Sequence, residues 1–302
     1  MRWSRRFLAR GVFWRQFLRW AVLNVPIWIE PAILVFWAFL FTLLWKSGRN
    51  AVMRNMKAVK PGSWALINFF RAYRVFCNFA WTIADNVRFR EMRMIPDWEF
   101  VGIENFEALK EHAGGAVIVT AHMGSYDLGA HLFAETSPRR IVMVRAPEID
   151  PQTRAFEEQQ KGRGATPEAL RIDFNTKAAD LAFELLDAVR SGELVAIQGD
   201  RVTPGIATLP ATLFGTKTRL PAGPFALAMA ARVPIFPLFV VRNGRRRYRL
   251  VTGSPITVER RSRDRDADLG RGLEAWIAQV EPVIAESWYQ WFHFEPIAEP
   301  PA

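Results

Sequence analysis

The sequence predicts an α/β protein whose largely parallel sheet is flanked by helices and preceded by a membrane-associated helical segment. Short apolar runs that suit buried strands alternate along the chain with stretches whose apolar residues recur at helical spacing. The first 50 residues differ from the rest, because many arginines stand there among tryptophan, phenylalanine and leucine. We therefore expect an amphipathic helix and membrane anchor over residues 1–50 and one α/β domain over residues 51–302.

The N-terminal segment predicts two membrane-associated parts. Residues 2–20 hold six arginines among apolar and aromatic residues, a composition typical of a basic helix lying on anionic lipid. Residues 32–45 then carry no charge, but as helix they would rise only about 21 Å, short of the about 30 Å hydrocarbon core. A start at Val25 would include two prolines and a glutamate. We expect a re-entrant or kinked anchor on the cytoplasmic side; a buried core helix is the alternative.

The elements of the domain follow from apolar periodicity and from turn residues. Strands with helices between them predict the parallel part of the sheet, and Asn243-Gly244 predicts a hairpin near its end. The expected helices span residues 63–84, 126–135, 151–161, 177–190, 222–231 and 269–289. The expected strands span residues 100–103, 116–121, 141–145, 194–198, 233–241 and 247–251, with a long loop over residues 199–220.

Charge and composition restrict the partners. The formal charge is +10, which indicates an anionic partner, and twelve tryptophans favour a membrane interface. The aromatic residues concentrate in apolar runs instead of alternating with lysine and arginine, so we expect an anionic membrane surface and no nucleic acid. The single cysteine, Cys77, excludes an internal disulfide. No spacing of histidine, cysteine or acidic residues suggests a metal site.

The most informative segment runs from Ala116 to Asp127. Its apolar first half predicts a buried strand that ends just before His122, Gly124 allows a turn, and Ser125 can cap the helix that follows. Open α/β sheets place ligands at this end of their strands. Asp127, in the first helical turn, could fold back onto the His122 ring, fix its tautomer and make it a base. The alternative is a hydrogen-bonded loop histidine next to an unrelated helix-start charge.

These residues resemble a known family. His122, four residues and Asp127 are similar to motif I of the glycerolipid and lysophospholipid acyltransferases. Residues 197–201, Ile-Gln-Gly-Asp-Arg, resemble the diverged Glu-Gly-Thr-Arg-like block of the bacterial lipid A late acyltransferases. Residues 213–215, 220–228 and 233–238 and the aromatic ending, residues 288–294, follow in that family's order. The lipid A enzymes usually carry Glu at the position of Asp127, and Gln198 and Asp200 replace Glu and Thr of the wider superfamily. These departures concern the acceptor more than the chemistry.

The resemblance implies an acyltransferase domain over residues 51–302 and a lipid A acyltransferase at the cytoplasmic face of a bacterial inner membrane. It implies direct transfer of a fatty acyl chain from an acyl carrier protein or coenzyme A thioester to a hydroxyl of a lipid A precursor or related glycolipid. No further cofactor is implied. The chain has no Gly-x-Ser-x-Gly elbow that would form an acyl-enzyme. The acceptor could instead be a lysophospholipid or another envelope lipid, and a catalytically inactive basic membrane-binding protein is the remaining alternative.

The resemblance and the residue chemistry together suggest roles for individual residues. His122 and Asp127 are expected to form the catalytic pair. Backbone N–H groups near Gly124 and Ser125 could stabilise an oxyanion. The substrate-binding candidates are Arg145, Gln198, Asp200 and Arg201, of which the arginines could hold a phosphate or carboxylate as a fork or form salt bridges with neighbours. The expected acyl groove is lined by Tyr126, Leu128, Phe214 and Phe225.

Overall fold

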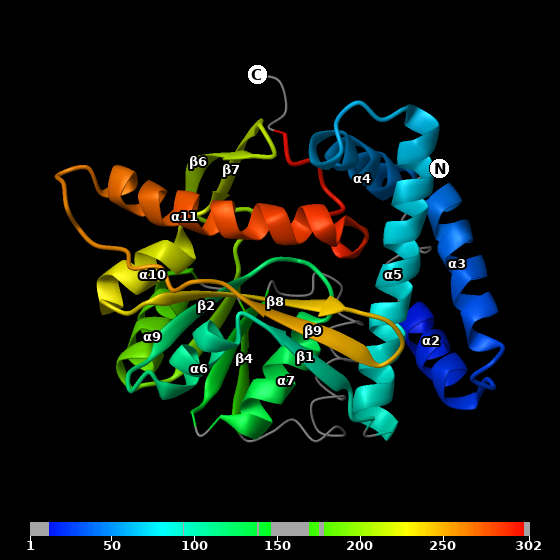
Figure 1. Ribbon diagram of the computed structural model, residues 1–302, viewed down its shortest axis with the longest axis horizontal. Coiled ribbons are helices and arrows are strands. Elements are labelled where there is room, and N and C mark those ends of the chain that lie inside the picture. Colours follow the sequence, from blue (N-terminus) through cyan, green and yellow to red (C-terminus); the bar gives the residue numbers. More distant parts are fainter. Residues whose placement is uncertain (1–11, 93, 138, 146–168, 175–177, 299–302) are drawn as a thin grey trace.

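A computed structural model describes residues 12–92, 94–137, 139–145, 169–174 and 178–298 of the chain. Its centre is a seven-stranded sheet in the order β1-β9-β8-β2-β5-β3-β4, with helices on both faces (Figure 1). All neighbouring strands are parallel except β8 and β9. The predicted α/β class with a largely parallel sheet is confirmed. The strands are β1 (Asp97–Val101), β2 (Ala116–Thr120), β3 (Ile141–Arg145), β4 (Leu170–Phe174), β5 (Leu194–Gln198), β8 (Ile235–Arg242) and β9 (Arg247–Thr252).

The two faces of the sheet form separate cores. On one face, α6 (Ile103–Glu111) and α7 (Tyr126–Thr136) cover a cluster that includes Leu109, Phe133 and Tyr248. On the other face, α9 (Ala178–Arg190), α10 (Gly223–Ala231) and α11 (Arg265–Glu286) cover a larger cluster around Phe225 and Trp276. Every residue of β2 is buried, as expected of a central parallel strand covered on both faces. The residues that follow β2 therefore extend from a strand that is packed on both faces.

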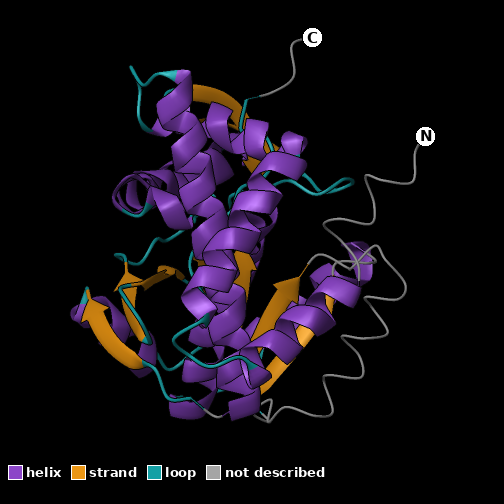
Figure 2. Cartoon of the chain, turned by 90° about the vertical axis from the view of Figure 1, so that its right-hand side faces the viewer, coloured by secondary structure: helices purple, strands orange, loops and turns teal. Residues whose placement is uncertain are grey.

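The N-terminal helices pack at one side of the sheet. They are α2 (Val12–Asn24), α3 (Glu30–Leu44), α4 (Lys46–Val59) and the long α5 (Ala65–Met92), which contacts each of the other three. Figure 2, which views the molecule from this side, shows helices in front, with strands behind and beside them. No single helix of the described residues is long and apolar enough to cross a membrane, but α3 and α4 together meet that criterion and are bent by 93° at their junction. This bend between two helices agrees with the expectation of a kinked N-terminal segment.

Several elements of the structure differ from those expected from the sequence. The expected loop over residues 199–220 contains a second, antiparallel sheet, made of β6 (Thr208–Leu213) and β7 (Thr216–Pro221). Its turn places Phe214 and Gly215 at positive φ, the conformation of a tight hairpin. Strand β4 and the short helix α6 were not among the expected elements. The expected helix over residues 151–161 and the first ten residues of the N-terminal helix lie outside the described residues. The hairpin at Asn243-Gly244 is confirmed.

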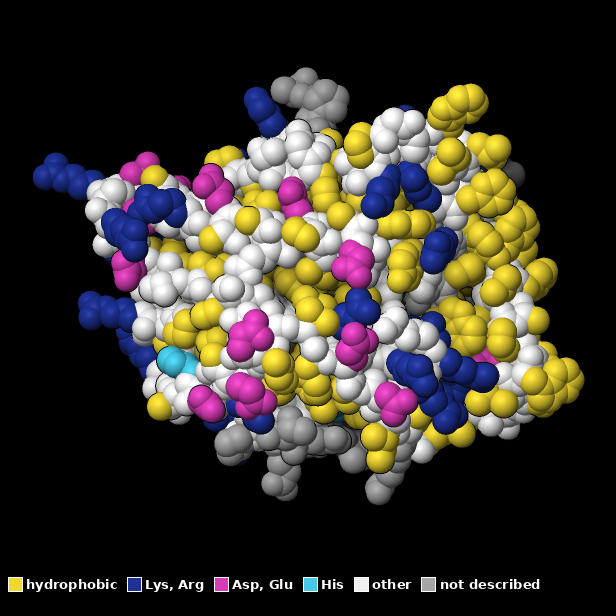
Figure 3. All heavy atoms as spheres, in the orientation of Figure 1, with side chains coloured by type: hydrophobic (Ala, Val, Ile, Leu, Met, Phe, Trp, Pro, Cys, Tyr) yellow, Lys and Arg dark blue, Asp and Glu magenta, His cyan; other side chains and the backbone are white. Residues whose placement is uncertain are grey.

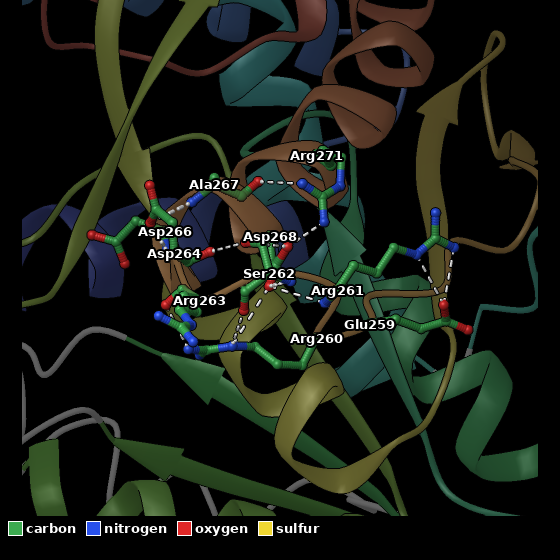
Figure 4. A network of polar contacts seen from close by, with 10 residues as sticks. All are labelled: Glu259, Arg260, Arg261, Ser262, Arg263, Asp264, Asp266, Ala267, Asp268 and Arg271. Atoms are coloured by element: carbon green, nitrogen blue, oxygen red, sulfur yellow. Dashed lines mark hydrogen bonds and ion pairs between the residues drawn. The ribbon is translucent and has the colours of Figure 1, made fainter.

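The longest helix on the second face, α11, begins at a dense polar network (Figure 4). Asp264 caps it by accepting hydrogen bonds from the backbone N–H groups of Asp266 and Ala267. Asp268, one turn into the helix, is buried and accepts from the backbone N–H groups of Arg261 and Ser262, and it also pairs with Arg271. Carboxylates in a first helical turn match the helix dipole. The network therefore fixes where α11 starts and how it lies over the sheet.

A chain of buried charges joins the N-terminal helices to the sheet. Glu30 at the start of α3 pairs with Arg88 of α5, and both side chains are almost fully buried. Arg88 also lies 3.7 Å from Asp85, whose other oxygen accepts from the Arg242 guanidinium at 2.9 Å and from the Tyr248 hydroxyl at 2.6 Å. Each charge in this chain has a partner of opposite sign, which buried charges require.

Replacement of Arg88 by methionine tests this network. Arg88→Met leaves the Glu30 carboxylate buried without its cation, so we expect the free energy of unfolding to fall by about 3–5 kcal/mol. Arg19→Ala removes the more exposed Arg19–Glu91 pair and should cost less than about 1 kcal/mol. Denaturant unfolding of the purified full chain measures both. Equal losses for the two variants would show that the buried chain does not hold the N-terminal helices.

Candidate functional site

The candidate site lies at the carboxyl edge of the sheet, where β2 and β5 end side by side. Thr120 and Gln198 are in register as the last residues of these strands, and His122 and Asp200 follow two positions later on each. His122 Nδ1 lies 2.7 Å from Asp200 Oδ1, and the His122 backbone N–H donates to the same oxygen at 2.9 Å. The contact joins residues 78 positions apart. The parallel register of two central strands therefore creates the pair.

Asp200 is held on all sides. Its carboxylate is 1% exposed, and its second oxygen accepts from the Trp291 indole N–H at 2.9 Å. The His293 ring lies 3.1 Å from its backbone oxygen. Burial alone would raise the pKa of this carboxyl, but the charge and hydrogen bond of His122, together with His293 and Trp291, hold the pKa well below its usual range. Asp200 is therefore a fixed carboxylate, suited to orient an imidazole.

Asp127 does not make the contact expected of it. Its carboxylate pairs with the Arg145 guanidinium at the end of β3, and Arg90 of α5 lies 3.9 Å from its other oxygen. The partner of the His122 ring nitrogen is Asp200 instead, so the expectation that Asp127 folds back onto His122 is wrong. The first turn of α7 directs Asp127 toward the neighbouring strand β3. Asp127 and Arg145 nevertheless lie at the same sheet edge as His122.

Gly124 and Ser125 form the turn from β2 into α7. Gly124 has φ +52°, and a Cβ there would lie 1.7 Å from the Val240 backbone oxygen, so only glycine fits. The Gly124 N–H donates to the Gln290 carbonyl at 2.9 Å and the Ser125 N–H to the Val240 carbonyl at 3.2 Å. Both donors expected to stabilise an oxyanion are thus already engaged. Ser125 is the N-cap residue of α7, but its hydroxyl donates to the Asn86 side chain and not to the helix.

A narrow, mostly apolar cavity opens beside this turn. It is enclosed by β2, β3, β5, β8 and α7 and lined by Ile118, Thr120, Tyr126, Gly129, Ala130, Phe133, Ile141, Met143, Val144, Ala196, Ile197, Gln198, Leu238 and Val240. The negative charge of Asp127 and burial raise the pKa of Tyr126 to about 12, so its phenol stays neutral. Of the four residues expected to line an acyl groove, Tyr126 lines this cavity. Leu128 and Phe225 are fully buried core residues, and Phe214 packs against Trp291.

Arg201 lines a second, more open groove. This groove lies between the start of α4 and the C-terminal segment, and Ser47, Asn50, Arg54 and Glu295 are among its other lining residues. Arg54 is exposed. Within the described part of the chain, neither Arg54 nor Arg201 forms an ion pair. No group of three histidine, cysteine or acidic side chains suited to a metal ion occurs among those residues either.

The C-terminal segment is the part of the site that the sequence did not reveal residue by residue. Met123 and Trp291 form an antiparallel bridge, the Phe292 N–H donates to the His122 carbonyl at 2.7 Å, and the Gln290 carbonyl accepts from Gly124. The Gln290 side chain also bonds the backbone N–H and carbonyl of Arg242. The dense aromatic run at residues 288–294 was a signal for this role, because fully buried aromatic residues near a chain end must pack against an existing core.

Comparison with known proteins gives one result that covers almost the whole chain. Residues 1–296 match the family model described as "Bacterial lipid A biosynthesis acyltransferase". A search of curated proteins finds no significant match to the chain.

The buried Asp200 carboxylate predicts a specific pH dependence of stability. Its pKa in the folded protein lies below the value of about 3.9 for an unfolded chain. The ionised Asp200 carboxylate therefore stabilises the folded protein fully at pH values above the unfolded pKa, and this stabilisation is lost as the pH falls. The difference in unfolding free energy between wild type and Asp200→Asn should shrink on acidification from about pH 5 to about pH 3. Urea unfolding at several pH values measures it; a difference that stays constant or grows would contradict the assignment.

Proposed function

Because the chain belongs to the bacterial lipid A biosynthesis acyltransferase family, we propose that it transfers a fatty acyl chain from a thioester carrier to a hydroxyl of a lipid A precursor or related envelope glycolipid. The observation that carries the proposal beyond family membership is the His122–Asp200 pair at the carboxyl edge of the sheet. A partly exposed imidazole held by a buried carboxylate is an arrangement suited to take a proton from an alcohol.

His122 is the base of this reaction, and Asp200 orients it. Asp200 accepts a hydrogen bond from the Nδ1–H group of the neutral ring, which leaves the lone pair on Nε2 free for the acceptor hydroxyl. As Nε2 takes that proton, the acceptor oxygen attacks the thioester carbonyl carbon directly and forms the new ester bond. The tetrahedral intermediate then expels the thiolate, and the His122 imidazolium returns the proton to sulfur. No acyl-enzyme forms.

Asp127 has a separate role in the proposal. Its pairing with Arg145, reinforced by Arg90, holds a guanidinium at the end of β3. There Arg145 can approach an anionic group of a substrate bound at the sheet edge. Loss of the Asp127 carboxylate would remove this ion pair and lower the rate without changing the His122 tautomer.

In this scheme the acyl chain enters the apolar cavity beside His122, which has room for a few methylene groups in this structure and must widen to hold a longer fatty chain. It is lined by aliphatic and aromatic side chains, and Thr120 and Gln198 at its polar end lie directly before the His122–Asp200 pair along the strands. A fatty acyl chain in the cavity would leave its thioester at the sheet edge. The carrier, acyl carrier protein or coenzyme A, would then remain outside the cavity.

The acceptor approaches from the groove that holds Arg54 and Arg201. The two arginines come from α4 and from the segment after β5, and they give the groove a cationic character that suits a phosphorylated glycolipid. Since Arg201 follows Asp200 directly, a headgroup bound there would bring its hydroxyl close to His122. A lysophospholipid also carries a phosphate that these arginines can bind, and mass spectrometry of the acylated lipid distinguishes the two acceptors.

Membrane attachment belongs to the N-terminal segment, residues 1–50, and to the start of α5. Large apolar side chains are exposed on α3 and its neighbours, among them Trp28, Phe36, Leu44, Trp64, Leu66 and Phe70. Figure 3 shows hydrophobic side chains gathered over α3 and α5 at the right-hand edge of the molecule. Exposed apolar patches of this kind mark contact with a membrane or a partner. With the net charge of +10, this supports attachment to the anionic cytoplasmic face of the inner membrane.

The base assignment predicts the effects of three substitutions. His122→Ala should abolish acyl transfer, and Asp200→Asn should lower its rate by about 10²–10⁴-fold, the usual contribution of general base catalysis. His112→Ala, at a histidine outside the site, should leave the rate unchanged. Mass spectrometry of envelope lipids from cells with each variant reports the acceptor and the added chain together. A lipid that gains the same acyl chain with His122→Ala as with wild type would exclude His122 as the base.

The acyl cavity predicts a change in chain preference. Met143 lines the cavity from β3, so Met143→Ala lengthens the available space by most of a side chain. We expect the preferred donor to become longer by about two to four carbons, measured by competition between acyl thioesters of different length. Leu109→Ala, a core change outside the cavity, is the control. If the preferred acyl length changed equally in both variants, or in neither, the acyl chain would bind outside this cavity.

A further inference from the structure

Two buried polar atoms in the acyl cavity have no hydrogen-bond partner. They are the Thr120 hydroxyl oxygen and the Gln198 amide nitrogen: within the described part of the chain neither forms a hydrogen bond of normal length, and the Gln198 side chain interacts only with the neutral Tyr126 phenol, whose pKa it lowers. Buried polar groups in native proteins are nearly always paired, and an unpaired one costs stability. Of the unpaired buried atoms in the described residues, these two line a cavity. A ligand that supplies the missing partner would explain why they are present.

Their position is tied to the catalytic pair. Thr120 and Gln198 face each other in register on β2 and β5, and both contribute to the cavity wall. His122 and Asp200 follow two residues after the ends of these strands, and two residues of extended chain span about 6–7 Å. An acyl chain that fills the cavity must therefore carry its reactive end past these two donors before it reaches the base.

The reaction needs donors that the turn after β2 does not supply. The tetrahedral intermediate places negative charge on the former carbonyl oxygen, which catalysts stabilise with hydrogen bonds fixed in advance. The Gly124 and Ser125 N–H groups donate to the Gln290 and Val240 carbonyls and are not free for this purpose. The Thr120 hydroxyl and the Gln198 amide can both donate, and no charged side chain lines their cavity.

We propose that Thr120 and Gln198 form the oxyanion site of the enzyme. In the bound donor, the thioester carbonyl oxygen accepts from the Thr120 hydroxyl and from the Gln198 amide. When the acceptor oxygen attacks the carbonyl carbon, the carbonyl π electrons move to this oxygen, and both hydrogen bonds strengthen. The electrons return as the carbon–sulfur bond breaks. This inference rests on the proposed function, since it assigns an acyl thioester to the cavity.

Steady-state kinetics and thermal unfolding of matched variants test the proposal. We expect Gln198→Leu and Thr120→Val each to lower kcat by about 10²–10³-fold, with less than threefold change in KM for the thioester. The melting temperature of Thr120→Val should not fall, because this substitution removes an unpaired buried group. That of Gln198→Leu should change little, because the only interaction lost is the one with the Tyr126 phenol. Thr120→Ser keeps the hydroxyl and should keep most of the activity. Thr252→Val is the control, since Thr252 is buried and unpaired but does not line the cavity.

The possible outcomes separate this inference from the proposed function. If wild type transfers an acyl chain and both variants keep its kcat, the oxyanion site is elsewhere and the acyltransferase proposal stands. A lowered melting temperature that parallels the lost activity would make the two residues structural. If the variants lose kcat only with thioesters whose acyl chain carries a hydroxyl, then Thr120 and Gln198 bind that hydroxyl and not the thioester carbonyl. This result would overturn the proposal. If wild type moves no acyl chain from any thioester, the proposed function itself fails.

Discussion

The hydrogen bond between His122 and Asp200 depends on the parallel register of β2 and β5, and the rest of the site is arranged around it. Neither residue is near the other in sequence, and neither lies within a strand. Both stand two positions beyond the strand ends, where an error of one residue in register would separate them. The fully buried β2 and its pairing with β5 on one side and β8 on the other prevent such an error. The packing of the sheet core therefore sets the position of His122 relative to Asp200.

The C-terminal segment closes the site from the other side. Trp291 bonds the Asp200 carboxylate, Phe292 bonds the His122 backbone, and Gln290 connects the Gly124 turn to β8. Because Arg242 of β8 is also the last member of the buried charge chain that begins at Glu30, the same region is linked to the N-terminal helices. A displacement of α3 would therefore be opposed by contacts that reach the loop after β2. Paired buried groups thus connect the N-terminal helices with the loop that carries His122.

The sequence predicted much of the fold and brought the candidate residues to one edge of the sheet, but it assigned the wrong hydrogen-bond partner to His122. His122 and the block around Asp200 could be found because each follows a short apolar strand, a local pattern. The contact between them is not local, whereas Asp127 is near His122 in sequence and therefore looked like its partner. The hairpin of β6 and β7 was missed because its turn uses Phe214 at positive φ instead of an Asn-Gly pair. The two unpaired polar atoms in the cavity could not be predicted, since pairing is a property of the folded core.

The central claim is that Asp200 orients His122, and the tautomer of the ring tests it most directly. Nitrogen-15 NMR of the histidine-labelled protein distinguishes a ring protonated at Nδ1 from one protonated at Nε2. We expect the neutral His122 ring to carry its proton on Nδ1 in wild type and in Asp127→Asn, and to lose this preference in Asp200→Asn. A tautomer that changes in Asp127→Asn and persists in Asp200→Asn would contradict the account.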